Sequence, residues 1–394
     1  MPNPSPFPPI PPTIHLTMKR PNTTSPTPPR SDDFSTNLEQ TQESAESPRK
    51  PDLRHLATVR QLADQLVAAL QSLPDGDLVA EIIDNALKLL RDRTNRGDIK
   101  LINKALKEIR YALKIFAPYR HIHKVSMFGS ARTPESSPDY QQAADFAKGM
   151  VAAGWMVITG AGGGIMAAGH GGAGADPSFG LAIRLPHEQA ANPTIAQDEK
   201  LINFKYFFTR KLLFVRAANA LALFPGGFGT LDEGFEVLTL IQTGKSVPMP
   251  VVMIDHPGGT YWKDWLHYIQ TDLLERHLIS PSDLSLFKIT NSNEEAIREI
   301  TRFYNNYHSV RTVRSDLVIR LQRKPTPAQL AQINTRFADL TDSQPFRVAG
   351  PLPEESDEPA LAHLHRLVFP FNHHDHGRLR VLIDFLNDLP AIQQ

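Results

Sequence analysis

Glycines, a threonine and two adjacent carboxylates stand together in the middle of the chain, within ALALFPGGFGTLDEGFEV from Ala220 to Val237. Glycines let backbone N–H groups approach an oxyanion closely, and the N-terminus of a following helix favours negative charge. The same letters also fit a capping box, in which Thr230 and Glu233 bond each other's backbone N–H groups. The stretch therefore predicts either an anion site with a carboxylate beside it or a tight turn ahead of a capped helix.

Two more glycine loops follow short apolar stretches that are typical of strands. One is Phe128-Gly129-Ser130-Ala131-Arg132, and the other is TGAGGG from Thr159 to Gly164. Ligands of an open α/β sheet bind at the carboxyl ends of its strands, where such loops lie. Three of these loops on one edge, with Arg132 in one of them, predict a binding site for a small anion.

The second loop also fits a dinucleotide fingerprint when it is read Gly162-x-Gly164-x-x-Ala167. That fingerprint requires an acid about 20 residues further on to bind the ribose. Ile183, Arg184 and Leu185 occupy that place instead. A dinucleotide-dependent oxidoreductase is therefore the weakest of the functions that the sequence allows.

Arg210 and Lys211 lie upstream of the third loop, in a helical segment that leads into its strand. Such cations have three interpretations: solvent-facing residues of a helix, partners of Glu233, or clamps on a phosphate. A carboxylate and a phosphate repel each other, so a site that holds both needs cations to balance them. We expect Glu233 to contact Arg210 in an open pocket. The competing expectation is a Glu233 carboxylate that bonds the Thr230 N–H and turns away from the site.

Composition narrows the classes of function. The chain of 394 residues has 42 Lys and Arg against 42 Asp and Glu, and it has no cysteine. Neutral charge argues against a broad surface for a nucleic acid polymer, and the lack of cysteine excludes disulfides, thiolate metal sites and cysteine nucleophiles. The longest uncharged run, Met150 to Gly169, is broken by glycines and predicts a buried strand with its loop rather than a membrane span. No secretory pattern is visible at the start, which predicts a cytoplasmic protein.

The first part of the chain divides into a tail and a helical segment. Residues 1–50 hold twelve of the 33 prolines and few large apolar residues, which predicts a disordered Pro-rich tail. Met18 within it is a candidate for the true start. Residues 51–118 have apolar residues at three- and four-residue intervals and predict three helices, with breaks near 74–76 and 95–97.

Residues 119–308 alternate short apolar strands with helices. The strands are expected at 124–128, 155–159, 179–185, 220–224 and 250–255, and a helix near 293–305 closes the domain. This rhythm predicts an α/β fold, a Rossmann-like parallel sheet with helices on both faces.

Residues 309–394 predict a small α+β module in the order β-α-β-β-α, which suggests a ferredoxin-like or ligand-sensing fold. Its histidine-rich stretch NHHDH, residues 372–376, has the residue types of a metal site. We interpret it as a loop in which Asp375 caps the last helix, and no metal site is predicted.

Together these motifs resemble the Lonely Guy (LOG) family in its longer bacterial form, over roughly residues 120–305. The motifs are Phe128-Gly129-Ser130-x-Arg132, Gly162-Gly163-Gly164-Ile165-Met166, Leu185-Pro186-His187-Glu188-Gln189, Arg210-Lys211 and Pro225-Gly226-Gly227-x-Gly229-Thr230-x-x-Glu233. Members of that family are phosphoribohydrolases, which release a free base from a nucleoside 5′-monophosphate. Many carry the label lysine decarboxylase, but no residue of this sequence independently indicates a pyridoxal-phosphate lysine.

The resemblance implies Arg210 and Glu233 as the catalytic pair. It implies nucleotide or phosphate contacts for Gly129, Ser130, Arg132, Gly162, Gly163, Gly164, Met166, Lys211, Gly226, Gly227, Gly229 and Thr230. It also implies a homodimer or higher homo-oligomer with the pocket at or near the subunit interface, and a reaction that needs no metal and no cofactor.

We therefore expect an enzyme that hydrolyses the N-glycosidic bond of AMP, a pyrimidine nucleotide or a cytokinin riboside monophosphate. The alternative is a non-catalytic nucleotide-binding or sensory protein that uses its flanking parts to contact partners. Tight nucleotide binding without turnover distinguishes the alternative from the enzyme.

Overall fold

The computed structural model describes residues 53–184, 191–342 and 344–390. The predicted disordered tail, the Met18 start and the LPHEQ motif at 185–189 lie outside the described residues.

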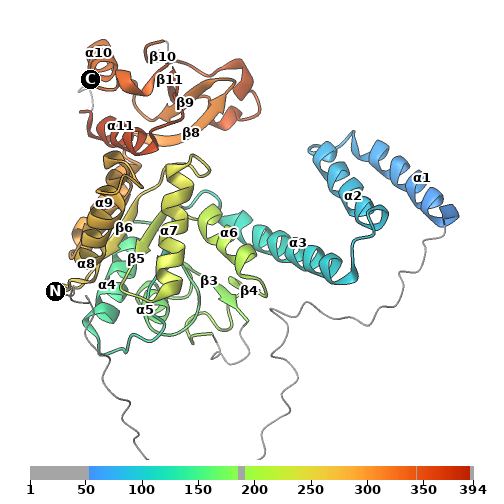
Figure 1. Cartoon of the computed structure of the whole chain (residues 1–394), viewed down its shortest axis with the longest axis horizontal. Helices are drawn as coiled ribbons and strands as arrows, with labels where there is room; N and C mark the ends of the chain where they lie inside the picture. Colours follow the sequence, from blue (N-terminus) through green and yellow to red (C-terminus); the bar gives the residue numbers. More distant parts are fainter. Residues whose placement is uncertain (1–52, 185–190, 343, 391–394) are drawn as a thin grey trace, which may run out of the picture. The chain divides into compact units, whose positions relative to one another are not determined.

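A seven-stranded sheet forms the centre of the structure, in the order β4-β3-β2-β1-β5-β6-β7 (Figure 1), and each pairing along it is parallel. Its strands are β1 (Lys124–Phe128), β2 (Met156–Thr159), β3 (Ser178–Ile183), β4 (Leu201–Phe204), β5 (Ala220–Leu223), β6 (Val251–Ile254) and β7 (Lys288–Thr290). The sequence does not predict β4 and β7, the two edge strands. Their sequences, LINF and KIT, mix exposed and buried side chains and so lack the continuous apolar run of a central parallel strand.

Helices cover both faces of this sheet, and the predicted α/β, Rossmann-like fold is confirmed. One face carries α4 (Pro138–Ala152), α5 (Ile165–Ala173) and α9 (Asn293–Phe303), and the other carries α3 (Arg96–Phe116), α6 (Phe207–Ala217), α7 (Phe228–Gln242) and α8 (Tyr261–Tyr268). Strand β1 shows why both faces are covered. Val125 and Met127 pack against the first group of helices, whereas the Ser126 hydroxyl, on the opposite face, donates to the Phe214 carbonyl of α6 at 3.1 Å.

The strand order reverses between β1 and β5. From β1 the chain adds β2, β3 and β4 on one side and then returns to place β5, β6 and β7 on the other. In open α/β sheets, ligands bind outside the carboxyl ends of the strands at such a reversal. The topology therefore selects the loops that follow β1 and β5, together with the neighbouring loop after β2.

Three helices precede the sheet, as the apolar periodicity predicts: α1 (Leu53–Leu70), α2 (Gly76–Arg91) and α3. Glu108 of α3 is 4% exposed. Its carboxylate accepts hydrogen bonds from the Lys205 N–H at 2.8 Å and the Thr209 hydroxyl at 2.7 Å. Helix α3 thereby anchors the beginning of α6, the helix that carries Arg210.

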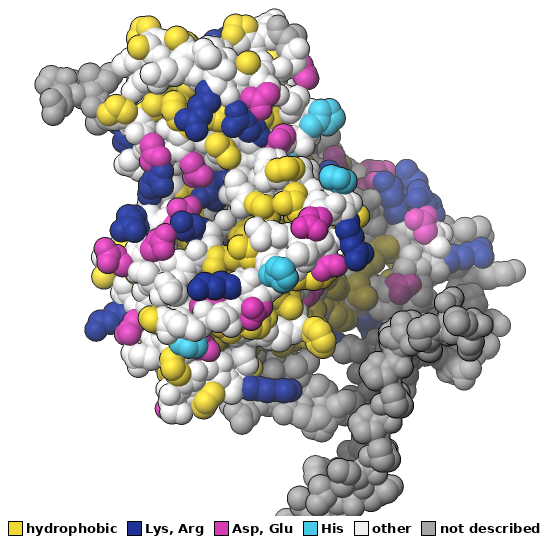
Figure 2. All heavy atoms as spheres, turned by 60° about the vertical axis from the view of Figure 1, so that its left-hand side comes forward, with side chains coloured by type: hydrophobic (Ala, Val, Ile, Leu, Met, Phe, Trp, Pro, Cys, Tyr) yellow, Lys and Arg dark blue, Asp and Glu magenta, His cyan; other side chains and the backbone are white. Residues whose placement is uncertain are grey.

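The surface and the apolar segments agree with the composition. Basic and acidic side chains are interspersed on the face shown in Figure 2, as expected of a chain with equal numbers of both. No helix within the described ranges is long and apolar enough to cross a membrane. The uncharged run from Met150 to Gly169 supplies the end of α4, strand β2 and the first half of α5.

The C-terminal residues form a second, antiparallel sheet in the order β10-β11-β9-β8. Its elements are β8 (Tyr307–Val313), β9 (Asp316–Leu321), α10 (Pro327–Arg336), β10 (Arg347–Ala349), β11 (His365–Pro370) and α11 (His376–Asp388). Strand β8, whose polar residues hide its pattern, is added to the predicted order. A ferredoxin-like fold contains a split β-α-β unit with parallel strands, so this all-antiparallel module differs from that expectation. The division of the chain at 118/119 and 308/309 stays a proposal.

The histidine-rich loop ahead of α11 has a capping role. The Asp375 side chain accepts the Arg378 N–H at 2.7 Å and is the N-cap of α11, as expected. Across the described part of the chain, no group of three or more His, Cys, Asp or Glu side chains is placed to hold a metal ion.

A buried ion cluster lies on one face of the second sheet. The Glu355 carboxylate accepts hydrogen bonds from the Nε atoms of Arg320 at 2.8 Å and Arg366 at 3.0 Å, and all three side chains are buried. Burial by itself would raise the pKa of Glu355, but hydrogen bonds from the Leu352 N–H and from both arginines bring it down to about 2. The cluster therefore keeps its charges across the neutral pH range.

Glu355→Gln should destabilise the module by about 3–5 kcal/mol, because it leaves buried arginines without their carboxylate. Glu354→Gln is the matched control: the Glu354 partner, Arg314, has a side chain 82% exposed, so its loss should cost less than about 1 kcal/mol. Denaturant midpoints check both variants, and equal midpoints would contradict the buried cluster. In the parent chain, the contribution of Glu355 is full above its ordinary pKa of 4.5 and is lost as pH falls toward about 2.

Candidate active site

The three glycine loops meet at the carboxyl edge of the central sheet, and Ser130 connects them. Its N–H donates to the Pro225 carbonyl of the third loop at 3.1 Å, and its carbonyl accepts the Ile165 N–H, at the end of the second loop, at 3.0 Å. Its hydroxyl accepts the Arg132 N–H at 3.1 Å, and the Arg132 side chain is exposed. The structure thus brings the three predicted loops together.

The second loop packs closely against the first loop and against Met166. A Cβ on Gly164 would lie 2.2 Å from the Ser130 carbonyl oxygen, and the φ of Gly164 is +57°, which L side chains rarely adopt. A Cβ on Gly162 would lie 2.7 Å from the Met166 Cε. Only glycine fits these two positions without movement of the neighbours.

Two other predicted contact residues are also packed within the loops. A Cβ on Gly129 would lie 2.6 Å from the Ile165 side chain, and one on Gly163 would lie 3.4 Å from the Ala131 carbonyl oxygen. Gly129 therefore has a steric reason to be glycine, whether or not it contacts a ligand.

The third loop opens into the first turn of α7. Gly227 is the N-cap, and its carbonyl accepts the Thr230 and Leu231 N–H groups at 3.0 and 3.2 Å. Gly227 and Gly229 are exposed, and a Cβ on either would meet no atom within 4 Å. The first N–H groups of a helix have no intrahelical acceptor and favour an anion. This turn is therefore open to a phosphate.

Thr230 and Glu233 do not form the capping box. Helix α7 begins at Phe228, so Thr230 lies inside its first turn, and the Thr230 N–H is bonded to Gly227 rather than to Glu233. The Thr230 side chain lies against Gly226, where a Cβ would be 2.2 Å from Oγ1. The expectation of a Glu233 carboxylate turned back onto Thr230 is therefore wrong.

Glu233 lies one turn further along α7, close to the loops. The residue is 4% exposed, and its Oε2 accepts no hydrogen bond from the described residues. Burial raises the pKa of Glu233 to about 7, although the charges of Lys211 and Arg210 act to lower it. A carboxyl group with such a pKa gains and loses its proton near neutral pH, as a general base must.

Lys211 is the cation that contacts the acids of α7. Its Nζ lies 2.7 Å from the Asp232 Oδ2, 2.6 Å from the Glu236 Oε2 and 3.8 Å from the Glu233 Oε2. The sequence predicts Arg210 in contact with Glu233 and Lys211 among the phosphate ligands. The structure instead pairs Lys211 with the carboxylates.

Arg210 lies beside the second loop. A Cβ on Gly160 would be 4.0 Å from the Arg210 Nη1, and the guanidinium stands 4.9 Å from the centre of the Phe207 ring. Its charge lowers the pKa of Glu233, so the two groups are within electrostatic reach. The predicted pair thus belongs to one site.

A buried polar network, absent from the sequence prediction, holds the second loop. Asn192 donates through Nδ2 to the carbonyls of Ala161 at 3.0 Å and Gly162 at 3.1 Å, and it lies 3.2 Å through Oδ1 from the Nδ1 of His170. The His170 Nε2 is 3.1 Å from the Thr159 hydroxyl. Ala161 has a φ of +65°, an uncommon conformation for a residue with a side chain. The network stabilises this strained turn, and no spacing in the sequence links 192 to 161.

Asn192→Ala should loosen the second loop. It leaves two carbonyls and one imidazole nitrogen without Asn192, at a cost of about 1–3 kcal/mol. We expect a lower thermal midpoint and faster hydrogen exchange at 161–164. Asn203→Ala, an exposed asparagine of β4, should change neither, and an equal effect of both variants would contradict the positioning role.

Comparison with known proteins gives a family for this part of the chain. Residues 163–300 match the family described as possible lysine decarboxylase. That range contains α5, α6 and α7, and hence Met166, Arg210 and Glu233. No curated protein matches the chain.

Several solved structures are similar to the chain at a distance. The molybdenum cofactor carrier protein of Chlamydomonas reinhardtii is 18% identical, with a TM-score of 0.33 over 46% of this chain and 97% of that one. The molybdenum cofactor binding protein of Rippkaea orientalis is 19% identical, with a TM-score of 0.31 over 46% and 94%. DNA processing protein A of Helicobacter pylori is 11% identical, with a TM-score of 0.30 over 46% and 80%. Similarities this distant carry no argument about function.

The family match covers the second and third glycine loops and both residues of the expected catalytic pair. It agrees with the motifs that resemble the Lonely Guy family, whose members often carry the lysine decarboxylase label. The α/β domain of this chain is therefore a member of the Lonely Guy family, which is also described as possible lysine decarboxylase.

Proposed function

We propose that this edge of the sheet hydrolyses the N-glycosidic bond of a nucleoside 5′-monophosphate, giving a free base and ribose 5-phosphate. The observation that carries the proposal is the buried Glu233 carboxylate, one turn from a helix N-terminus that is open to a phosphate. Family membership supports the same class of reaction. The candidate substrates are AMP, a pyrimidine nucleotide and a cytokinin riboside monophosphate.

The substrate would bind through its phosphate. The N–H groups at Gly227 and Gly229, with the positive end of α7 behind them, suit a 5′-phosphate. The phosphate is remote from the bond that breaks, so its binding energy can position the ribose without weakening the reacting bond. Ser130 and Arg132, from the adjoining loop, stand next to this phosphate in the proposal.

The reaction needs a carboxylate near the anomeric carbon. As the C1′–N bond breaks, its electron pair leaves with the base and positive charge builds on the ribose, which a nearby carboxylate stabilises. A water molecule adds to C1′ and gives one proton to Glu233, and the departing base takes up a proton from solvent. Glu233 then returns its proton to solvent, which restores the site.

Two cations adjust the charge of that carboxylate. Burial raises the pKa of Glu233, and Lys211 and Arg210 act against the rise. Part of the Glu233 population is therefore ionised at neutral pH, as the reaction requires. In the proposal, Arg210 also orients the phosphate or the ribose, because its guanidinium lies on the side of the second loop.

A nucleotide panel tests the function. Purified protein is incubated with AMP, CMP and isopentenyladenosine monophosphate, and free base and ribose 5-phosphate are measured. Release of both products from at least one nucleotide is expected. Tight binding by calorimetry without release of either product would overturn the enzyme and favour the sensory alternative. The homo-oligomer that the resemblance implies is proposed as well, and light scattering measures it.

A further inference from the structure

The helices α1 and α2 form a hairpin that has almost no interior of its own. Gly76 and Ala80 are its only buried residues among those whose burial the structure describes. Large apolar side chains of both helices are exposed: Val59, Leu62, Leu66, Leu78, Val79, Ile82 and Leu90 are each at least 41% exposed. Short isolated helices are marginal in water, and packing of an apolar face supplies most of their stability. This hairpin therefore needs a partner surface.

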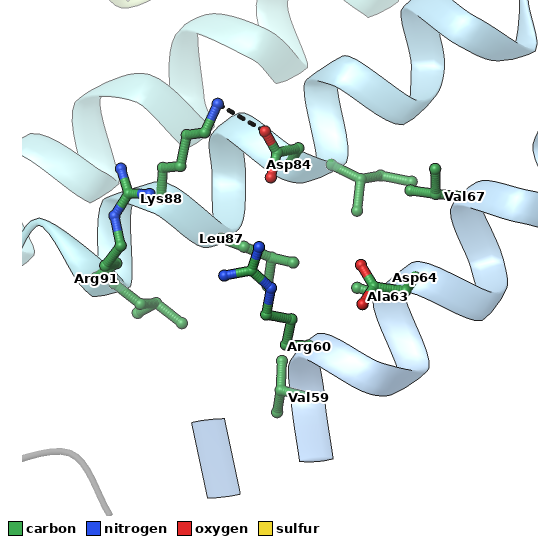
Figure 3. Close-up of a pocket in the computed structure, with 11 residues that line it drawn as sticks. Val59, Arg60, Ala63, Asp64, Val67, Asp84, Leu87, Lys88 and Arg91 are labelled. Atoms are coloured by element: carbon green, nitrogen blue, oxygen red, sulfur yellow. Dashed lines mark ion pairs between the residues drawn. The ribbon is translucent and has the colours of Figure 1, made fainter. Parts of the chain in front are cut away.

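A groove of about 300 Å³ runs between the two helices (Figure 3). Val59, Ala63 and Val67 line it from α1, and Ile83 and Leu87 line it from α2. These spacings of three and four residues form one stripe on each helix. The groove is thus an apolar seat that is open along its length to a helix of another molecule.

Charges along the groove alternate from end to end. Because the helices run antiparallel, Arg60 and Arg91 mark one end, whereas Asp64 and Asp84 lie further along (Figure 3). Lys88 pairs with Asp84 at 2.6 Å. A second copy turned end to end by a two-fold axis would set its basic end over the acidic residues of the first. Such a surface is self-complementary, as an interface with two-fold symmetry requires.

We propose that this hairpin is a self-association element. The α1–α2 hairpin of one chain packs antiparallel against the α1–α2 hairpin of a second copy, and the four helices form a bundle with the exposed leucines and isoleucines inside. The charged residues at the rim of the groove set the antiparallel direction. This inference does not depend on the proposed enzyme activity.

The chain has no cysteine, so a single engineered thiol tests the proposal directly. Ala63→Cys places that thiol in the middle of the groove, and Glu275→Cys places it at an exposed site outside the hairpin. With a short bis-maleimide, we expect covalent dimers from Ala63→Cys and none from Glu275→Cys at the same concentration. If the Ala63→Cys variant reacts with a monofunctional maleimide but yields no dimer with the bifunctional one, the proposal is overturned.

The mass of the full-length assembly gives a second, independent readout. Leu66→Asp with Ile82→Asp should halve the mass by light scattering, whichever other interface the chain has, because it removes one two-fold contact. Gln65→Asp adds the same charge at the neighbouring exposed position of α1 and should leave the mass unchanged. Unchanged mass in the double variant would overturn the proposal, as would loss of mass in both. Activity on the nucleotide panel is measured separately, so failure of one proposal does not affect the other.

Discussion

Glu233→Gln should lower kcat/KM by about 100-fold to 10,000-fold, the range typical of a lost general base. The amide keeps the size of the side chain but cannot take a proton from water, and it has no charge to stabilise the positive ribose. The nucleotide should still bind, because its phosphate contacts the first turn of α7 rather than residue 233. Calorimetry with the product ribose 5-phosphate checks that binding. A variant with full turnover would keep the reaction and discard this mechanism.

The same substitution should make the folded protein more stable at alkaline pH. The pKa of Glu233 is about 7 in the folded chain against an ordinary 4.5, so between these values the folded state binds a proton that the unfolded state has released. Stability contributed at residue 233 therefore falls as pH rises from 4.5 to 7, by about 3 kcal/mol in total. Glutamine does not titrate. The variant should match the parent at pH 4 and exceed its denaturant midpoint at pH 8.

The pH profile of the parent enzyme follows from the same group. The active form is the carboxylate, so kcat/KM should reach a plateau above about pH 7 and fall about tenfold per pH unit below it. Lys211→Met removes the largest charge that lowers the pKa of Glu233, so its acid limb should move to higher pH. Acid limbs at one pH in both proteins would show that another group titrates.

Three glycines of the third loop should respond to alanine in opposite ways. Gly226→Ala forces a Cβ to within 2.2 Å of the Thr230 Oγ1 and 2.9 Å of the Ser130 nitrogen. We expect a loss of about 1–3 kcal/mol of stability, as for other overpacked sites, and disruption of the contact between the first and third loops. The thermal midpoint measures this loss.

Gly227→Ala and Gly229→Ala are the matched controls, because a Cβ on either meets no atom within 4 Å. Gly229 lies in the first turn of α7, where alanine should stabilise the helix by about 0.5–1 kcal/mol. If the phosphate binds against this turn, the added methyl groups displace it, and a shift of about 1 Å can cost about 100-fold in kcat/KM. Stable variants with unchanged kcat/KM would place the phosphate elsewhere.

Part of the fold follows from local patterns. The strands β1, β2, β3, β5 and β6 are each flanked by glycine loops or helices, and their apolar residues are continuous because both faces of a parallel strand are buried. The strands β4, β7 and β8 lack that pattern. They lie at the edges of their sheets, where burial is incomplete and local sequence says little about pairing.

The sequence by itself determined the kind of site: three glycine loops at strand ends, with a carboxylate and cations close in the chain. Those features are local, since a tight turn needs glycine and a helix N-terminus attracts an anion wherever it stands. Tertiary structure alone decided which of two local solutions Glu233 adopts. The capping box is a short-range arrangement, and it gives way because α7 begins at Phe228 and not after Thr230. Burial and the neighbouring cations then set the pKa of Glu233, and both come from residues that only the folded chain brings together.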